Sequence, residues 1–287
     1  MTASRYSPRG FRPVFRIHRE GRLLRPFESI GFVLGFFWQV LAAIPFTLTH
    51  YRYQTIRVIT DLTWGRGAVF VGGGTVPLLA VLGVAMGALI GVESFTTLNM
   101  VGLGPLTGII SSYASTRELA PIAAAIGFAA QAGCRMTAEI GAQRISEEID
   151  AIESMGLRSI PFIVTTRVIA GAVALVPTFL ITLILSYTAC RLLITTIHGQ
   201  SSGVYDHYFL QFVSGPDILA AVGKTLVFGV VVIVIHCYQG YYAAGGPEGV
   251  GVASGRAVRA SFVAIIALNM LLSLVFWGFD ASISFTG

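Results

Sequence analysis

The chain has 287 residues, of which 54% are hydrophobic and only 11% are charged, and its mean hydropathy is +0.76. Soluble proteins carry roughly a quarter charged residues, so this composition excludes an ordinary water-soluble domain and indicates an integral membrane protein. The apolar runs are about 20 residues or longer and do not alternate as barrel strands do. We therefore predict an all-α membrane protein, because helices satisfy their own backbone hydrogen bonds in lipid.

The formal net charge of +5 is distributed unevenly along the chain. Residues 1–26 hold seven arginines against a single acid, Glu20. Such a tail ahead of membrane spans is typical of the cytoplasmic side of a membrane rather than of a nucleic-acid partner. No cleavable signal peptide is expected, because no apolar stretch precedes the end of the arginine run.

The predicted elements follow this tail in chain order. Residues 27–67 are expected to form interfacial or membrane-entry helices, and whether 27–50 crosses the membrane stays open. A permease-like body of 68–287 follows, with five predicted transmembrane helices at 68–92, 104–133, 160–190, 218–240 and 260–279. An odd number of spans places the two termini on opposite sides, with the N-terminus cytoplasmic and the C-terminus periplasmic.

Two connections between these spans have a distinct composition. We expect 191–217 to be a polar connection outside the cytoplasm and the glycine-rich 243–259 to be a cytoplasmic turn. Within the first span, Gly83, Gly87 and Gly91 recur every four residues. This tandem spacing predicts a face on which a neighbouring helix packs closely.

No nucleotide, metal or catalytic motif is complete in the sequence. The "VGKT" at 222–225 resembles the end of a phosphate-binding loop, but Ile218 stands where that loop requires glycine. The three cysteines are widely spaced, and the histidines form no metal-binding or catalytic pattern. We expect no cofactor or metal in this chain, and no enzymatic activity of its own.

Arg117 and Glu118 interrupt the second span directly before Pro121. Each ionisable residue inside a span costs on the order of 3 kcal/mol, so both must be paired or face a cavity. Two interpretations stay open: a structural pair beside a helix break, or the polar rim of a substrate cavity. Lys224 and Asp217, near the end of the fourth span, are interpreted as interfacial residues.

The segment "RISEEIDAIESMG" at 144–156 gathers four of the 14 acidic residues. Its isoleucines recur at helical spacing, which predicts one amphipathic helix at about 137–156 with the acids on its exposed face. Ser146 is expected to cap this helix and Gly156 to end it. An acidic face is disfavoured on an anionic lipid surface, so we expect a protein partner there.

The sequence resembles a known family over about residues 50–287. The run "RELAPIAAAIGFAAQAGCRMTAEIGAQRISEEIDAIESMG" is similar to the central signature of the MlaE/YrbE permeases of ATP-binding-cassette lipid transporters. Ala120 replaces the glycine of the family's "RELGP". The later runs "GQSSGVYDHYF" and "HCYQGYYAAGGPEGVGVASGRAVR" resemble actinobacterial YrbE subunits of Mce systems, and the B-type more than the A-type.

The resemblance implies partners and functional residues. It implies a heterodimer with an A-type YrbE permease in the cytoplasmic (inner) membrane, two copies of a cytoplasmic ATPase that hold ATP and magnesium, and a hexamer of Mce proteins. The coupling helix toward the ATPase would contain Arg144, Glu147, Glu148, Asp150, Glu153, Met155 and Gly156. A lipid cavity would be lined by Ile90, Phe95, Thr97, Leu98 and Met100, near Arg117 and Glu118.

The function implied is import of fatty or mycolic acids or sterols, driven by ATP in the partner. Two alternatives stay open from the sequence. One is an ion-coupled secondary transporter, which would need membrane-embedded carboxylates such as Glu118. The other is a structural membrane scaffold for the Mce hexamer that binds no lipid itself.

Overall fold

The computed structural model describes residues 25–63 and 75–278, and the side chains from residue 31 onward. The chain divides into two units, Met1–Trp38 and Gln39–Gly287, which we describe separately. The basic tail up to residue 24, the start of the predicted first span and the last predicted residue of the fifth lie outside the described residues.

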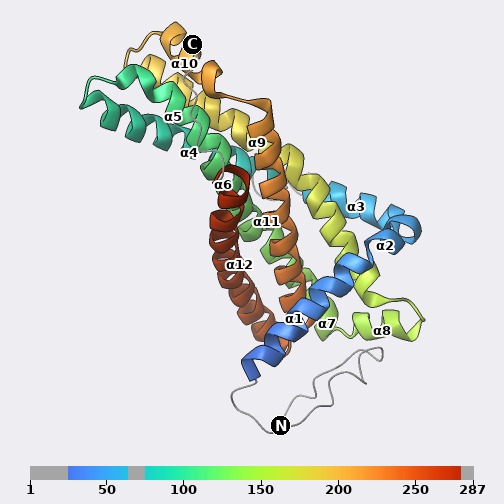
Figure 1. Ribbon diagram of the computed structural model, residues 1–287. Helices are drawn as coiled ribbons and strands as arrows, with labels where there is room; N and C mark the ends of the chain where they lie inside the picture. Colours follow the sequence, from blue (N-terminus) through green and yellow to red (C-terminus); the bar gives the residue numbers. More distant parts are fainter. Residues whose placement is uncertain (1–24, 64–74, 279–287) are drawn as a thin grey trace. The chain divides into compact units, whose positions relative to one another are not determined.

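All regular secondary structure in the described residues is helical (Figure 1). The helices before the permease body are α1 (Arg25–Ala42), α2 (Ile44–His50) and α3 (Arg52–Thr63). They are followed by α4 (Thr75–Asn99), η1 (Gly104–Leu106), α5 (Thr107–Ala114), η2 (Ser115–Leu119), α6 (Ala120–Phe128), η3 (Ala129–Gly133), α7 (Cys134–Ile145) and α8 (Glu148–Ser154). The remainder is η4 (Ile160–Thr165), α9 (Thr166–Thr196), α10 (Ser202–Phe212), α11 (Gly215–Tyr241) and α12 (Gly246–Trp277).

Five helical segments are long and apolar enough to cross a membrane, which confirms the predicted fold class. They are Thr75–Asn99, Gly104–Ile145, Ile160–Thr196, Gly215–Tyr241 and Gly246–Trp277. The pair Gly31–Ala42 and Ile44–His50 passes the same test jointly but is bent by 42°. Both predictions for 27–50, a membrane span and an interfacial helix, therefore stay open.

The sequence suggested that the second span is interrupted directly before Pro121, but the structure shows no interruption there. Instead the helix runs from residue 104 to residue 145 through two π-helical segments, η2 and η3. A π-turn widens the backbone ring locally. The helix accommodates the proline at the start of α6, directly after the wider turn.

The predicted turn at 243–259 is wrong for most of its length, because α12 begins at Gly246. Gly245 has a φ of +96°, and a Cβ on Gly249 would lie 1.9 Å from the Ala244 carbonyl oxygen. The glycines thus allow a tight entry into the helix. Glycine costs about 1 kcal/mol in a helix interior, but α12 packs along α7 and α11, and this packing outweighs propensity.

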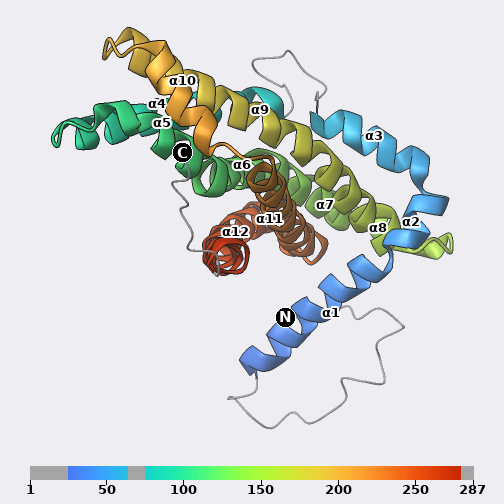
Figure 2. The same ribbon diagram turned by 45° about the horizontal axis from the view of Figure 1, so that its top comes forward.

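The connection at 191–217 also contains a helix, α10, which packs against α5 (Figure 2). The Tyr205 hydroxyl donates to Ser111 Oγ at 2.9 Å. Arg191 donates two hydrogen bonds of 2.7 Å to the Asp206 carboxylate, and these bonds hold the pKa of Asp206 below its ordinary value. Two contacts therefore fix α10 onto the ends of α5 and α9.

The glycine strip of α4 lies against α9. A Cβ on Gly83 would lie 2.5 Å from the Thr182 carbonyl oxygen, and one on Gly87 would lie 2.0 Å from that of Ser186. At Gly91 the nearest atom, Cys190 Sγ, is 3.4 Å away. The two backbones therefore meet most closely at the first two glycines, in the manner of small-residue helix packing.

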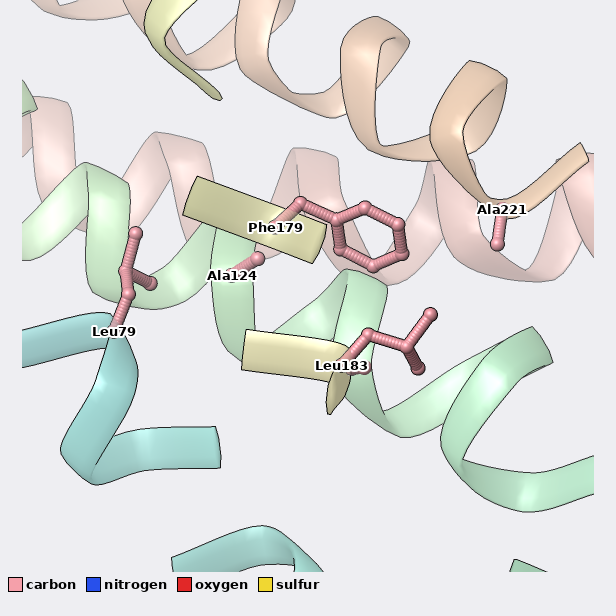
Figure 3. Packing of buried hydrophobic residues seen from close by; sticks show 6 residues of the cluster. Leu79, Ala124, Phe179, Leu183 and Ala221 are labelled. Atoms are coloured by element: carbon pink, nitrogen blue, oxygen red, sulfur yellow. The ribbon is translucent and has the colours of Figure 1, made fainter. Parts of the chain in front are cut away.

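A buried apolar cluster lies beside this crossing and joins four helices (Figure 3). Phe179 and Leu183 of α9 lie among Leu79 of α4, Ala124 of α6 and Ala221 of α11. All five side chains are at most 2% exposed. The cluster holds α11, which carries the polar groups described below, against the α4 and α9 pair.

We predict that Gly87→Ala destabilises the chain. The added methyl group would meet the Ser186 backbone, which cannot move as a side chain can, and overpacking of this kind costs about 1–3 kcal/mol. The midpoint of denaturant-induced unfolding in detergent measures the effect. Gly223→Ala in α11 is the matched control, because nothing lies within 4 Å of its added Cβ. Equal stability of the two variants would contradict close packing at Gly87.

Candidate functional site

Lys224 of α11 is a fully buried ammonium group in the described structure. Its Nζ donates to the Glu118 carboxylate at 3.2 Å, to the Arg117 carbonyl oxygen at 2.8 Å and to Ser273 Oγ at 2.7 Å. Pro121 lacks the amide that would bond to the Arg117 carbonyl in a regular α-helix. The Lys224 ammonium group supplies that missing donor. The carbonyl left free by Pro121 in turn gives the buried ammonium group an acceptor.

Glu118 accepts hydrogen bonds from two residues of α12 in addition to Lys224. Asn269 Nδ2 donates at 2.7 Å and Ser273 Oγ at 2.6 Å. The glutamate side chain nevertheless remains 39% exposed in the isolated chain. Its carboxylate is therefore both held in place and open on one side.

A second ion pair lies toward the start of α11. Arg117 Nη2 is 3.0 Å from Asp217 Oδ2, and both side chains are 17% exposed. Trp277 Nε1 donates to the other carboxylate oxygen at 2.7 Å, and the Arg117 guanidinium lies 3.6 Å from the centre of the Tyr113 ring. We call the two ion pairs and their α12 partners the polar cluster; its members are Arg117, Glu118, Asp217, Lys224, Asn269, Ser273 and Trp277.

One interpretation of the sequence was that Arg117 and Glu118 form a structural pair. In the structure they do not pair with each other. Each pairs with a residue of α11, so Lys224 and Asp217, interpreted from the sequence as interfacial residues, are partners in ion pairs within the chain. The spacing of these residues in the sequence could have indicated that they lie on the same helix faces. Asp217 and Lys224 are seven residues apart, and the α12 donors recur every four residues, so each set lies on one helix face.

Two buried atoms of the polar cluster have no hydrogen-bond partner among the described residues. They are Arg117 Nε, a donor, and Asn269 Oδ1, an acceptor. Buried polar atoms are rarely left unpaired, because each costs about 1–3 kcal/mol. Both atoms lie inside the bundle, so the open side of Glu118 is the part of these groups that a further polar group could reach.

The other predicted cavity residues lie at the end of α4. Ile90 is only 5% exposed and packs with Cys190, Ile194 and Tyr205, so its side chain is part of the core. Phe95 packs on the same group, and its ring centre is 4.1 Å from that of His198.

Leu98 is half-buried, whereas Thr97 is exposed and Met100 is 81% exposed. Leu119, which is next to Glu118, packs against the Ile90 cluster. The end of α4 and the polar cluster are therefore connected through Leu119 of η2, and the cavity that the seven residues would line stays a prediction.

The acidic segment forms two helices in place of the single helix predicted at about 137–156. Helix α7 ends at Ile145, Glu147 has a φ of +61°, and α8 begins at Glu148. Ser146 does not cap α8, because its hydroxyl donates back to the Gln143 carbonyl oxygen at 3.4 Å. The left-handed residue turns the chain between the helices, which hydrophobic spacing cannot reveal.

The end of α8 has the geometry expected for a glycine stop. Gly156 has a φ of +81°, and its N–H donates to the Glu153 carbonyl at 3.0 Å. The Leu157 N–H donates to the Ile152 carbonyl at 3.3 Å. These two bonds form a Schellman motif, which satisfies the last carbonyls of a short helix.

The faces of α8 differ from the predicted pattern in two respects. Of the expected apolar stripe, only Ile149 is fully buried, whereas Met155 is 68% exposed. Of the acids, Glu147, Glu148 and Asp150 are exposed, and Arg144 Nη1 is 2.8 Å from Asp150 Oδ1. Glu153 instead faces inward and accepts hydrogen bonds from Ser159 and Tyr241.

A family model described as Permease MlaE matches residues 64–275. The chain belongs to the MlaE permease family. The match covers α4 to α12 almost completely, and with them the polar cluster and α8. The family assignment therefore rests on the part of the chain that carries both candidate sites.

Several curated relatives of this MlaE-family chain are similar over most of their own length. A "Probable ABC transporter permease protein" of Rickettsia bellii is 28% identical over 209 residues, 73% of this chain and 81% of the relative. The "Intermembrane phospholipid transport system permease protein MlaE" of Haemophilus influenzae is 26% identical over 208 residues, 71% of this chain and 80% of the relative. "Protein TRIGALACTOSYLDIACYLGLYCEROL 1, chloroplastic" of Arabidopsis thaliana is 32% identical over 186 residues, 65% of this chain and 52% of the relative.

We predict that Glu118 and Lys224 of this MlaE-family permease stabilise each other strongly. Glu118→Gln leaves Lys224 buried without a counter-charge and should lower the free energy of unfolding by about 3 kcal/mol. Lys224→Met should also destabilise the chain, and the double variant should lose much less than the sum of the two. Unfolding of the four proteins in mixed micelles measures the coupling.

Glu93→Gln, which removes an exposed carboxylate of α4, controls for loss of a charge as such. If the effects of Glu118→Gln and Lys224→Met simply add, the two groups do not stabilise each other.

Proposed function

We propose that this chain is the membrane-spanning permease subunit of an ATP-driven lipid transporter. The observation that carries the proposal is α8, a short helix between two spans with exposed carboxylates. Its first-turn acids Glu148 and Asp150 are exposed, and so is Glu147 just before it. A charged, water-facing helix at the end of an apolar bundle is suited to bind a protein on that side of the membrane.

The energy source in this proposal lies in a separate subunit. The sequence contains no complete phosphate-binding loop, and relatives of the chain are named as ABC transporter permeases. ATP and magnesium are accordingly assigned to a cytoplasmic ATPase dimer. Residues Glu147, Glu148 and Asp150 of α8 are assigned to its docking surface, and closure of the ATPase would push α8 as a rigid body.

The polar cluster is assigned to the lipid. A lipid has a polar head and apolar tails, and Glu118 lies half-open on a bundle whose other outward-facing side chains are largely apolar. The open side of the Glu118 carboxylate offers an acceptor to a donor on the head group. The Haemophilus influenzae relative is named for phospholipid transport, which supports a lipid substrate.

We further propose an Mce-type transporter, from the resemblance of 199–209 and 236–259 to B-type YrbE subunits. Its partners would be an A-type YrbE permease and a hexamer of Mce proteins. Its substrates would be fatty or mycolic acids or sterols, taken up across the cytoplasmic membrane. The N-terminus and α8 would be cytoplasmic and the C-terminus periplasmic, which places Arg135 and Arg144 of α7 toward the cytoplasm.

We predict that Glu147→Lys with Glu148→Lys abolishes assembly with the ATPase. Two reversed charges at an interface cost several kcal/mol, so the amount of co-purified ATPase should fall by about tenfold or more. Quantitative co-purification of the co-expressed subunits measures this. Glu153 is unsuitable for the test, because it is hydrogen-bonded within the chain.

The matched control is Glu248→Lys, which reverses an exposed carboxylate in the first turn of α12, close in sequence to the inner end of α11. This variant should retain the ATPase. Retention of the ATPase by the Glu147→Lys and Glu148→Lys double variant would overturn the assignment of α8.

A further inference from the structure

The Glu153 carboxylate joins helix α8 to the membrane helices. Glu153 Oε1 accepts from Ser159 Oγ at 2.6 Å and from the Tyr241 hydroxyl at 3.2 Å. The two hydroxyl oxygens are themselves 2.8 Å apart. Three side chains from three elements therefore close one triangle: Glu153 from α8, Ser159 from the start of η4 and Tyr241 from the end of α11.

This triangle is shielded from water on the membrane-helix side. Tyr241 is 1% exposed and Ser159 is 4% exposed. Hydrogen bonds to an ionised group are about twice as strong as neutral ones, and more so away from solvent. The contact at Glu153 is thus suited to transmit force, unlike an exposed salt bridge, which is worth about 0.2–1 kcal/mol.

Two further residues of α8 contact the rest of the chain. Ile149 is fully buried, and Asp150 is bonded to Arg144 at the end of α7. The helix is only Glu148–Ser154 long, so a tilt at either end moves the other. A push on its exposed acidic face must therefore reach the Glu153 triangle.

Helix α11 connects this triangle to the polar cluster. Tyr241 and Lys224 are 17 positions apart on one uninterrupted helix, which is about 25 Å at 1.5 Å per residue. Near its Tyr241 end, α11 packs closely against the second span. A Cβ on Gly240 would lie 2.8 Å from the Thr137 carbonyl, and Thr137 Oγ1 is 2.8 Å from His236 Nδ1.

We propose that Glu153 is a positioning residue that transmits movement of α8 through α11 to the Lys224 and Glu118 ion pair. This inference rests on the proposed function, because it assumes that a partner pushes α8. It adds which residue carries the movement and which helix receives it. The movement would change how Lys224, farther along the same helix, holds Glu118 of η2.

Trp277 provides a spectroscopic readout at the far end of this path. Its indole donates to Asp217 and lies 5.4 Å from Lys224 Nζ, measured to the ring centre. Only two other tryptophans, Trp38 and Trp64, occur in the chain. Incorporating 5-fluorotryptophan into this subunit alone gives ¹⁹F signals, and Trp277→Phe identifies the one that reports on the polar cluster.

The experiment adds a non-hydrolysable ATP analogue to the complex of the labelled chain with its ATPase. The Trp277 signal should shift in the wild type and in Tyr53→Phe, a control that removes the hydroxyl of an exposed tyrosine. In Tyr241→Phe, which deletes one donor to Glu153 and keeps the ring, the shift should be lost while the analogue still binds. Hydrogen exchange of the α8 amides should become about tenfold faster in this variant.

Two further variants separate transmission from folding. Glu153→Gln keeps one carbonyl acceptor and should retain part of the shift, whereas Glu153→Ala should lose it. An unchanged shift in Tyr241→Phe would overturn the inference, as would a wild type without any shift. In both cases the proposed function stands, since it is tested separately, by whether reversing Glu147 and Glu148 releases the ATPase.

Discussion

The burial of one ammonium group, that of Lys224, imposes the central constraint on this structure. An unpaired charge in the interior of a membrane bundle is costly, so Glu118, Ser273 and the Arg117 carbonyl must all meet at its Nζ. These partners come from the second span and from α12, and α11 must lie between them. This one side chain therefore links three of the five spans.

Helix α11 is accordingly the element on which both candidate sites depend. It contacts α6, α7, α9 and α12 and carries Lys224 two to three turns from one end and Tyr241 at the other. The first residue belongs to the polar cluster and the second belongs to the Glu153 triangle. In the proposed transporter, this shared helix joins the lipid-facing site to the ATPase-facing helix without a nucleotide site in the chain itself.

Hydropathy alone was sufficient to predict the five spans, because about 20 apolar residues in a row have few other stable uses. It did not predict their ends, since residues 246–259 are rich in glycine and become helical only through packing against α7 and α11. The acidic segment was recognised from its composition. The break at Glu147 was not, because a left-handed residue other than glycine leaves no mark in the spacing.

Only part of the candidate site could be predicted from the sequence, because a charge is conspicuous only when it lies in the middle of an apolar span. Arg117 and Glu118 attracted attention as charges inside a span, but Lys224 and Asp217 lay near a span end and looked like ordinary interfacial residues. Glu153 was assigned to the exposed face with the other acids, whereas it turns toward Tyr241. The positions of Lys224, Asp217 and Glu153 all depend on partners from distant parts of the sequence. A local sequence pattern does not contain this information.

The central claim is that lipid binds in this bundle at the polar cluster, which a structural scaffold would not require. Native mass spectrometry of the purified complex, followed by lipid identification, tests this claim most directly. The account predicts a defined lipid retained by the wild type and by Glu93→Gln, and its loss in Glu118→Ala. A complex that carries no lipid, or one whose lipid content is unchanged by Glu118→Ala, would contradict it.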